Sequence, residues 1–366
     1  MTSRELSITR LRDTLRHPTL YFANGDLVVS AESSDGSGMQ LFRVHTVILA
    51  QHSPVFGDML AIPAGPDGRE TYDGAHVVRF PDTAEDVEKL FSVFYNPGFP
   101  LFKRSDSDFA VDVYGLMRIA TKYQIDSICR AVKHHLECEW PHTVEELVRL
   151  HNDLKVAISR PLQSSPKPDH TAYKLFPEPA SAIRLATDFD VPSILPAAYY
   201  ILSTIAIEDT WDSTVNLGLH PLRRRARFEL LGDAELVRYF RGKAKLAREF
   251  VAMYKQVLDP AMTKLIYVDI EEDEVINRCD YQQECGTALA SIEGAIDEGH
   301  RESFEGAVWD SMHADPLMAL HNVAHLGALE EQLCFSCVYL VIRTIGQFQK
   351  KMWDDLPKTF NLVSDS

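Results

Sequence analysis

The stretch "FRVHTVILAQHSPVF", residues 42–56, contains several abrupt changes of local structure. Its first residues belong to a strand that ends at His45, and the apolar run 47–50 predicts a helical turn too apolar to face water. Ser53 and Pro54 then restart the helix, because serine caps a helix N-terminus and proline suits the first helical position. The stretch therefore predicts a strand, a short buried helix, a turn and a second short helix.

Two strands are expected on the N-terminal side. The segment 20–33 has Asn24-Gly25 as a turn signal followed by β-favouring residues, and 39–45 reads as its neighbour. The sequence "SSDGSG" between them is a loop by composition. These segments predict a hairpin-like pair, preceded by a polar lead up to about Pro18 with one or two helical turns.

A further strand and a longer helix are expected on the C-terminal side. Residues 61–75 read as a long polar loop and "HVVRF", 76–80, as a strand. The helix that follows is capped by Asp82 or Thr83, has acids in its first turn, and repeats apolar residues at helical spacing up to about residue 95.

Two later segments echo each other. "RIATKYQIDSI" at 118–128 and "RLATDFDVPSI" at 184–194 share five identical residues in register. Each predicts the end of one helix, a sharp turn and the start of another. Residues 160–179 are rich in Pro and Ser and predict an exposed loop. From residue 180 onward the pattern is helical, with 233–258 as the longest helical segment.

The order of these elements resembles the plan of a BTB/POZ domain, and the opening stretch makes the resemblance specific. Asp26-Leu27-Val28-Val29 is similar to the first part of the BTB pattern. The second part is matched by Phe42, His45, Ile48, Leu49, Ala50, Ser53 and Phe56. The downstream half resembles the helical tails of BTB proteins abundant in mushroom-forming fungi.

The resemblance implies an α+β BTB/POZ module, a small sheet with surrounding helices, followed by an all-α C-terminal domain. The expected layout is an N-terminal lead at 1–17, the BTB/POZ domain at 18–140 and the helical domain at 141–366. Within the module we expect the imidazole of His45 to bond backbone groups where the strand meets the helix. Asp26, Phe42, Leu49, Ser53 and Phe56 are likewise expected to be structural signatures.

The function implied by the resemblance is non-enzymatic protein–protein interaction, with self-association into a homodimer and a scaffolding role. Transcription-factor BTB domains carry a basic residue after the histidine, which forms a charged pocket with the Asp of the first strand; here that residue is Thr46. Adaptors of cullin-type ubiquitin ligases often carry an apolar-x-Glu motif after the second short helix, and residues 59–63 contain no Glu. A substrate adaptor of such a ligase remains an alternative.

Composition narrows the classes of partner. The chain of 366 residues has 37 Lys+Arg against 53 Asp+Glu, a formal net charge of −16. Direct nucleic-acid binding is disfavoured, because phosphate contacts need clustered basic side chains. The basic run 223–227 reads as a solvated helix face or a nuclear import signal. With no apolar signal segment and no long apolar span, we expect an intracellular protein, in cytoplasm or nucleus, without membrane contact.

No phosphate-binding, nucleophile-elbow or HExxH motif is present, and no catalytic residue is assigned. Four cysteines form two pairs, Cys279 with Cys285 and Cys334 with Cys337, whose thiolates could hold a tetrahedral zinc ion. Against zinc, the second pair lies in the apolar stretch "LCFSCVYLVI", where cysteine behaves as a small hydrophobe. Core packing, structural zinc, and a metal-dependent module or enzyme in the helical half all stay open.

Overall fold

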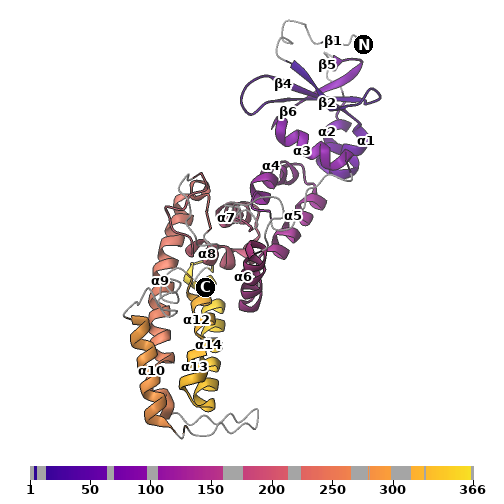
Figure 1. The fold of residues 1–366 in the computed structure, drawn as a ribbon. Coiled ribbons are helices and arrows are strands. Elements are labelled where there is room, and N and C mark those ends of the chain that lie inside the picture. The colour runs from indigo at the N-terminus through magenta and orange to yellow at the C-terminus, as the bar shows by residue number, and fades with distance from the viewer. Residues whose placement is uncertain are drawn as a thin grey trace. The chain divides into compact units, whose positions relative to one another are not determined.

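The structure is a computed structural model that describes residues 4–5, 14–63, 70–96, 106–159, 176–212, 224–264, 279, 281–297, 315–324 and 327–363. The chain divides into two compact units, Met1–Glu139 and Trp140–Ser366, called here the first and second unit (Figure 1). Each unit has its own buried core. We describe each unit by itself.

The first unit contains, among the residues described, a mixed sheet of six strands in the order β1-β5-β6-β3-β4-β2. The strands are β1 (Arg4–Glu5), β2 (Thr14–Tyr21), β3 (Leu27–Glu32), β4 (Met39–Val44), β5 (Glu70–Tyr72) and β6 (Ala75–Thr83). The expected hairpin is confirmed, because β3 and β4 pair antiparallel with Leu27 opposite Val44. Gly36 has φ 71°, a conformation that glycine adopts without strain, in the loop between them.

The strands at either side of this hairpin differ in part from the expectation. Residues 14–17, expected to belong to the polar lead with one or two helical turns, lie in strand β2, which pairs in parallel with β4. Residues 70–72, expected to be loop, form β5, which turns at Asp73-Gly74 into β6. Both residues of this turn have positive φ, as a type I′ hairpin turn requires. The predicted strand at 76–80 is confirmed as part of β6.

The helices of the first unit lie on one side of this sheet (Figure 1). They are α1 (Thr46–His52), α2 (Pro54–Ala61), α3 (Ala84–Tyr95), α4 (Phe109–Lys122) and α5 (Asp126–Glu139). Helix α3 packs on β3 and β6 and against α4, which in turn packs against α5. Its N-cap is Thr83, one of the two expected residues, whose hydroxyl accepts from the backbone N–H of Asp86.

The two echoing segments form the same turn, as predicted. Gln124 and Asp190 both have left-handed backbone angles, with φ 52° and 58°. In the first turn Ile125 N–H donates to the Ala120 carbonyl at 2.8 Å, and in the second turn residue 191 donates to residue 186 at 2.9 Å. This hydrogen bond to the carbonyl five residues back is the pattern that closes a Schellman helix end.

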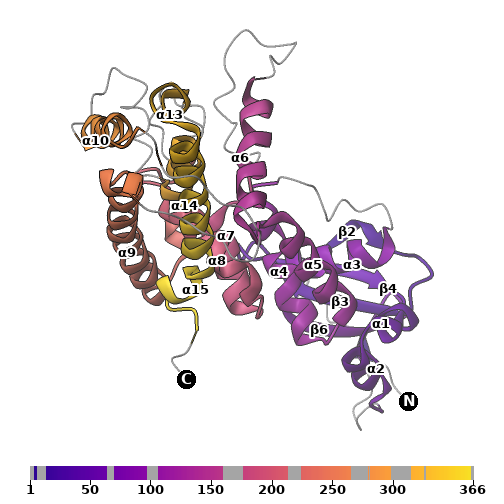
Figure 2. The same cartoon turned by 90° about the horizontal axis from the view of Figure 1, so that it is seen from below.

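Where the structure describes it, the second unit is helix-rich, as expected, with an isolated bridge between residues 210 and 226. Its α-helices are α6 (Val144–Ser159), α7 (Pro179–Asp188), α8 (Leu195–Ser203), α9 (Asp233–Val257), α10 (Gln282–Asp297), α12 (Pro316–Ala324), α13 (Gly327–Gln332), α14 (Phe335–Asp354) and α15 (Leu356–Thr359). Short 3-10 helices are η3 (Pro192–Ile194), η4 (Phe228–Leu230) and η5 (Pro260–Lys264). Helix α9 packs against α8, α12 and α14 (Figures 1 and 2). None of the helices described is both long and apolar enough to cross a bilayer.

The expected exposed loop lies mostly outside the described residues, which resume at residue 176. Its last residues are buried, contrary to the expectation, because they take part in the core of the second unit. The carboxylate of Glu178 caps α7 by accepting from the backbone N–H groups of Ala180 and Ser181. The guanidinium carbon of Arg224 lies over the ring of Phe176, 4.1 Å from the ring centre.

Candidate functional site

Helix α1 is fixed to the sheet by Asp26, just before β3. Its carboxylate accepts hydrogen bonds from the backbone N–H of Thr46 at 2.8 Å and from the Thr46 hydroxyl at 2.5 Å. Burial pushes the pKa of Asp26 up, but these hydrogen bonds outweigh it and hold the pKa below its ordinary value. Thr46 thus satisfies this acid with neutral donors, where the basic residue of the transcription-factor pattern would supply a charge.

His45 is the N-cap residue of α1 but makes no side-chain cap bond. Its backbone N–H donates to the hydroxyl of Tyr95 at 2.8 Å, and its ring Nδ1 lies 3.2 Å from the same oxygen. The expectation that the imidazole bonds backbone groups is therefore wrong, because α3 brings a tyrosine side chain to this junction. Burial raises the pKa of Tyr95 above its ordinary value, which further favours the neutral hydroxyl at this junction.

The other signature residues lie in the core of the first unit. Phe42, Leu49 and Phe56 are fully buried. Ser53 accepts from the backbone N–H of Phe56 at 3.0 Å and donates to the carbonyl of Tyr123 at 2.5 Å. These two hydrogen bonds join the start of α2 to the end of α4, which is a structural role for the Ser53 hydroxyl.

The apolar run 47–50 is largely exposed, so the expectation of a buried turn is wrong. Only Leu49 of this run is buried, whereas Val47 is 69% exposed and Ala50 is exposed. A helix of seven residues presents one face to the sheet, and residues off that face project into solvent.

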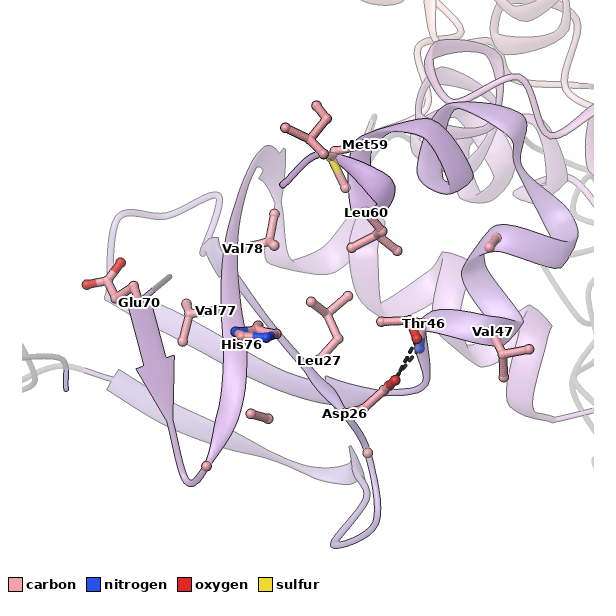
Figure 3. Close-up of a pocket in the computed structure, with 15 residues that line it drawn as sticks. Asp26, Leu27, Thr46, Val47, Met59, Leu60, Glu70, His76, Val77 and Val78 are labelled. Atoms are coloured by element: carbon pink, nitrogen blue, oxygen red, sulfur yellow. Dashed lines mark hydrogen bonds between the residues drawn. The ribbon is translucent and has the colours of Figure 1, made fainter. Parts of the chain in front are cut away.

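The exposed side of α1 borders an open groove of about 950 Å³, called here the α1–α2 groove. Figure 3 shows side chains from α1, α2 and β6 around Leu27. The groove is lined by Gly25, Asp26, Leu27, Thr46, Val47, Ala50, Met59, Leu60, Ile62, Glu70, Gly74, Ala75, His76, Val77 and Val78. Val47 and Ile62 are exposed by 69% and 64%, so large apolar side chains at this groove face solvent. Such a surface is typical of a protein-binding site.

The second unit brings the four predicted cysteines together. The Sγ atoms of Cys279, Cys285, Cys334 and Cys337 all lie within 4.8 Å of one another. Cys334 is the N-cap residue of α14, just outside the helix, whereas Cys337 lies buried inside the apolar helix as the stretch 333–342 indicated. Sequence reasoning placed only Cys334 wrongly, because the stretch has no Gly or Pro to mark the start of α14.

A buried polar network in the second unit was missed by sequence reasoning. Asp315 accepts from the hydroxyl of Tyr200 at 2.5 Å and lies 3.0 Å from Nε2 of His151. No local signal could have revealed this network, because Tyr200 and Asp315 lie 115 positions apart in the sequence.

The basic run 223–227 is not a solvated helix face. Arg224 is buried, and the guanidinium of Arg227 lies 3.8 Å from the ring centre of Trp211. Burial lowers the pKa of Arg224 to about 10. Residue 223 itself lies outside the described residues.

Comparison with known families identifies the first unit. Residues 26–138 match the family model of the BTB/POZ domain. No curated protein and no solved structure matches the chain. The resemblance carried by Asp26, His45, Ser53 and Phe56 is thereby confirmed. The chain contains a BTB/POZ domain, a class that generally mediates protein–protein interactions, followed by a helix-rich region.

Proposed function

We propose that this BTB/POZ-containing chain acts by binding other proteins, and that it self-associates through the α1–α2 groove and the exposed face of α1. The helical unit then serves as the second binding element of each copy. The observation that carries the proposal is the exposed apolar side chain of Val47, on a helix held rigidly by Asp26 and Tyr95.

Burial of apolar surface favours a complex in which a second copy covers the exposed face of α1. Fully burying an exposed valine or isoleucine side chain is worth about 1.5–3 kcal/mol before the costs of association are subtracted. Val47 and Ile62 are both exposed at the groove, and an isologous dimer would bury each of them twice. Two copies each carrying a net charge of −16 repel at long range, so we expect the dimer to strengthen as salt screens that repulsion.

The test compares Val47→Glu with the native full-length chain. Sedimentation or light scattering should give the native chain twice its mass of 41.3 kDa. Val47→Glu should give a monomer, because it would bury a charge in the interface. The matched control is Val111→Glu on α4, since Val111 is 41% exposed and does not line the groove. A native monomer, or a Val47→Glu dimer as tight as the native one, would contradict the proposal.

A cullin-type ubiquitin ligase is the second candidate partner. Ile62 is the C-cap residue of α2, and its side chain is exposed. Adaptors of such ligases dock through the region around this second short helix. The full-length chain is titrated with a cullin N-terminal domain, with Ile62→Glu as the variant and Val111→Glu as the control. Micromolar binding lost only in Ile62→Glu would make the chain a ligase adaptor whose helical unit holds the target. A dimer that does not bind the cullin domain would support a self-associating scaffold instead.

A further inference from the structure

The four-cysteine cluster in the second unit is assembled from two helix starts. Cys279 lies just before α10, and Cys285 lies in the first turn of α10. Cys334 is the N-cap residue of α14, and Cys337 lies in its first turn. Each pair therefore combines one residue outside a helix with one in its first turn, so both can face the same point.

The sulfur spacing fits a single tetrahedral ion. Zinc–sulfur bonds of about 2.3 Å in a tetrahedron place neighbouring sulfurs roughly 3.8 Å apart. Here Cys334 Sγ lies 3.7 Å from Cys279 Sγ, and no pair of the four exceeds 4.8 Å. An iron–sulfur cluster would insert several irons and sulfides between the thiolates and hold them further apart.

The surroundings suit thiolates. Cys279, Cys285 and Cys337 are buried and Cys334 is partly exposed, so the cluster is close to the surface on one side only. The backbone N–H of Cys334 points at Cys285 Sγ from 3.3 Å, a donor that stabilises negative charge on a metal-bound sulfur. The N-termini of α10 and α14 carry partial positive charge and lie at the cluster, which favours anionic ligands.

Ordinary core packing accounts less well for this arrangement. A side chain chosen only for its volume has no need to direct its sulfur toward three others, and aliphatic side chains would fill the space without polar atoms. All four cysteines are free thiols in the structure. A disulfide requires sulfurs about 2.05 Å apart, well below the 3.7 Å between Cys334 and Cys279.

The geometry points to a structural Zn²⁺ site formed by the thiolates of Cys279, Cys285, Cys334 and Cys337. With four protein ligands the ion has no open position for a substrate, so its role is to stabilise the fold. It joins the start of α10 to the start of α14 across 49 positions of sequence. The free energy of metal binding then contributes to the folding of this end of the second unit.

Metal content is the first readout, on the full-length chain purified with reductant and without chelator. We expect about one zinc per chain by elemental analysis. The double variant Cys334→Ser/Cys337→Ser should lose at least about nine-tenths of that zinc, because two ligands do not complete the tetrahedron. The control Cys129→Ser/Cys138→Ser removes the two cysteines of the first unit and should keep the zinc.

Removal and replacement of the ion in the native chain keep the test decisive if the double variant does not fold. All four tryptophans, residues 140, 211, 309 and 353, lie in the second unit, so their fluorescence follows its unfolding. A strong chelator should lower the unfolding temperature seen by tryptophan, and Zn²⁺ but not Mg²⁺ should restore it. Co²⁺ in its place should give the visible absorption of a tetrahedral thiolate complex.

Several results would overturn the proposal. A metal-free chain whose unfolding temperature is unchanged by chelator and by zinc would show that the four thiols serve only as core packing. Iron in place of zinc, a Cys279–Cys334 disulfide in the reduced preparation, or zinc retained by Cys334→Ser/Cys337→Ser would each assign the cluster to other chemistry. The outcome is independent of the α1–α2 groove, since the zinc readouts do not depend on the mass of the assembly.

Discussion

Replacing Ser53 by alanine tests how one hydroxyl serves two helix ends. Ser53 is 1% exposed and caps α2, where its oxygen accepts from the N–H of Phe56. The same hydroxyl donates to the carbonyl of Tyr123, the C-cap residue of α4. Both partners are helix-end groups without an intrahelical hydrogen bond, and neither site is open to water.

The expected loss follows from these two bonds. Removing a serine N-cap costs about 1 kcal/mol. Leaving a buried carbonyl unsatisfied costs about 1–3 kcal/mol more. We therefore expect Ser53→Ala to lower the free energy of unfolding of the first unit by about 2–4 kcal/mol.

The matched control is Thr83→Ala at the N-cap of α3. The Thr83 hydroxyl accepts one bond, from the N–H of Asp86 at 3.3 Å, and is only partly buried, so water can replace it. We expect a loss of about 1 kcal/mol. Both variants are unfolded in urea and followed by far-UV circular dichroism, with tryptophan fluorescence as the separate record of the second unit. A loss in Ser53→Ala no larger than that in Thr83→Ala would refute the reasoning that the carbonyl depends on Ser53.

Two further predictions concern the second unit. Gly242→Ala should destabilise it by about 1–3 kcal/mol, because the new Cβ would lie 2.1 Å from a ring carbon of buried Phe360. Gly346→Ala in α14 meets nothing within 4 Å and should stabilise it by up to about 1 kcal/mol; equal effects on tryptophan-detected unfolding would contradict the packing argument. Burial alone would raise the pKa of Asp315, but the hydrogen bond and charge of His151 prevail and lower it. The stabilising contribution of the Asp315 carboxylate is therefore present above the ordinary Asp pKa of about 4 and is lost as pH falls below it. We expect the difference in unfolding free energy between the native chain and Asp315→Asn to shrink from pH 7 to pH 3. A difference that stays constant with pH would disprove the linkage.

Local sequence was sufficient wherever a structure depends on neighbouring residues. Ser53 and Pro54 predicted the start of α2, and the echo at 118–128 and 184–194 predicted two helix ends that the structure builds alike. Caps and turns form between residues that are at most five positions apart, so their signals are complete in a short stretch. The spacing of Phe42, His45 and the capping pair was specific enough to predict the BTB/POZ domain.

Errors arose where a partner distant in the sequence decides the outcome. Residues 14–17 are mostly polar and the sequence does not predict a strand there, but β4 supplies backbone partners that hold them in the sheet. Local apolarity predicted burial of 47–50, yet whether a helix face is buried depends on what packs against it. The same limit applies to Arg224, which looked solvated and is buried beside Phe176.

The cysteines separate the two kinds of information most clearly. Sequence alone determined which four thiols could meet and that two pairs of this spacing can hold zinc. It could not determine whether they meet, because the two pairs are joined by 48 residues whose path no local pattern fixes. Only the packing of the second unit decided that the starts of α10 and α14 face each other and bring the Cys334 sulfur to 3.7 Å from that of Cys279. Spacing along the chain sets which groups are available, and tertiary contacts set the distances on which chemistry depends.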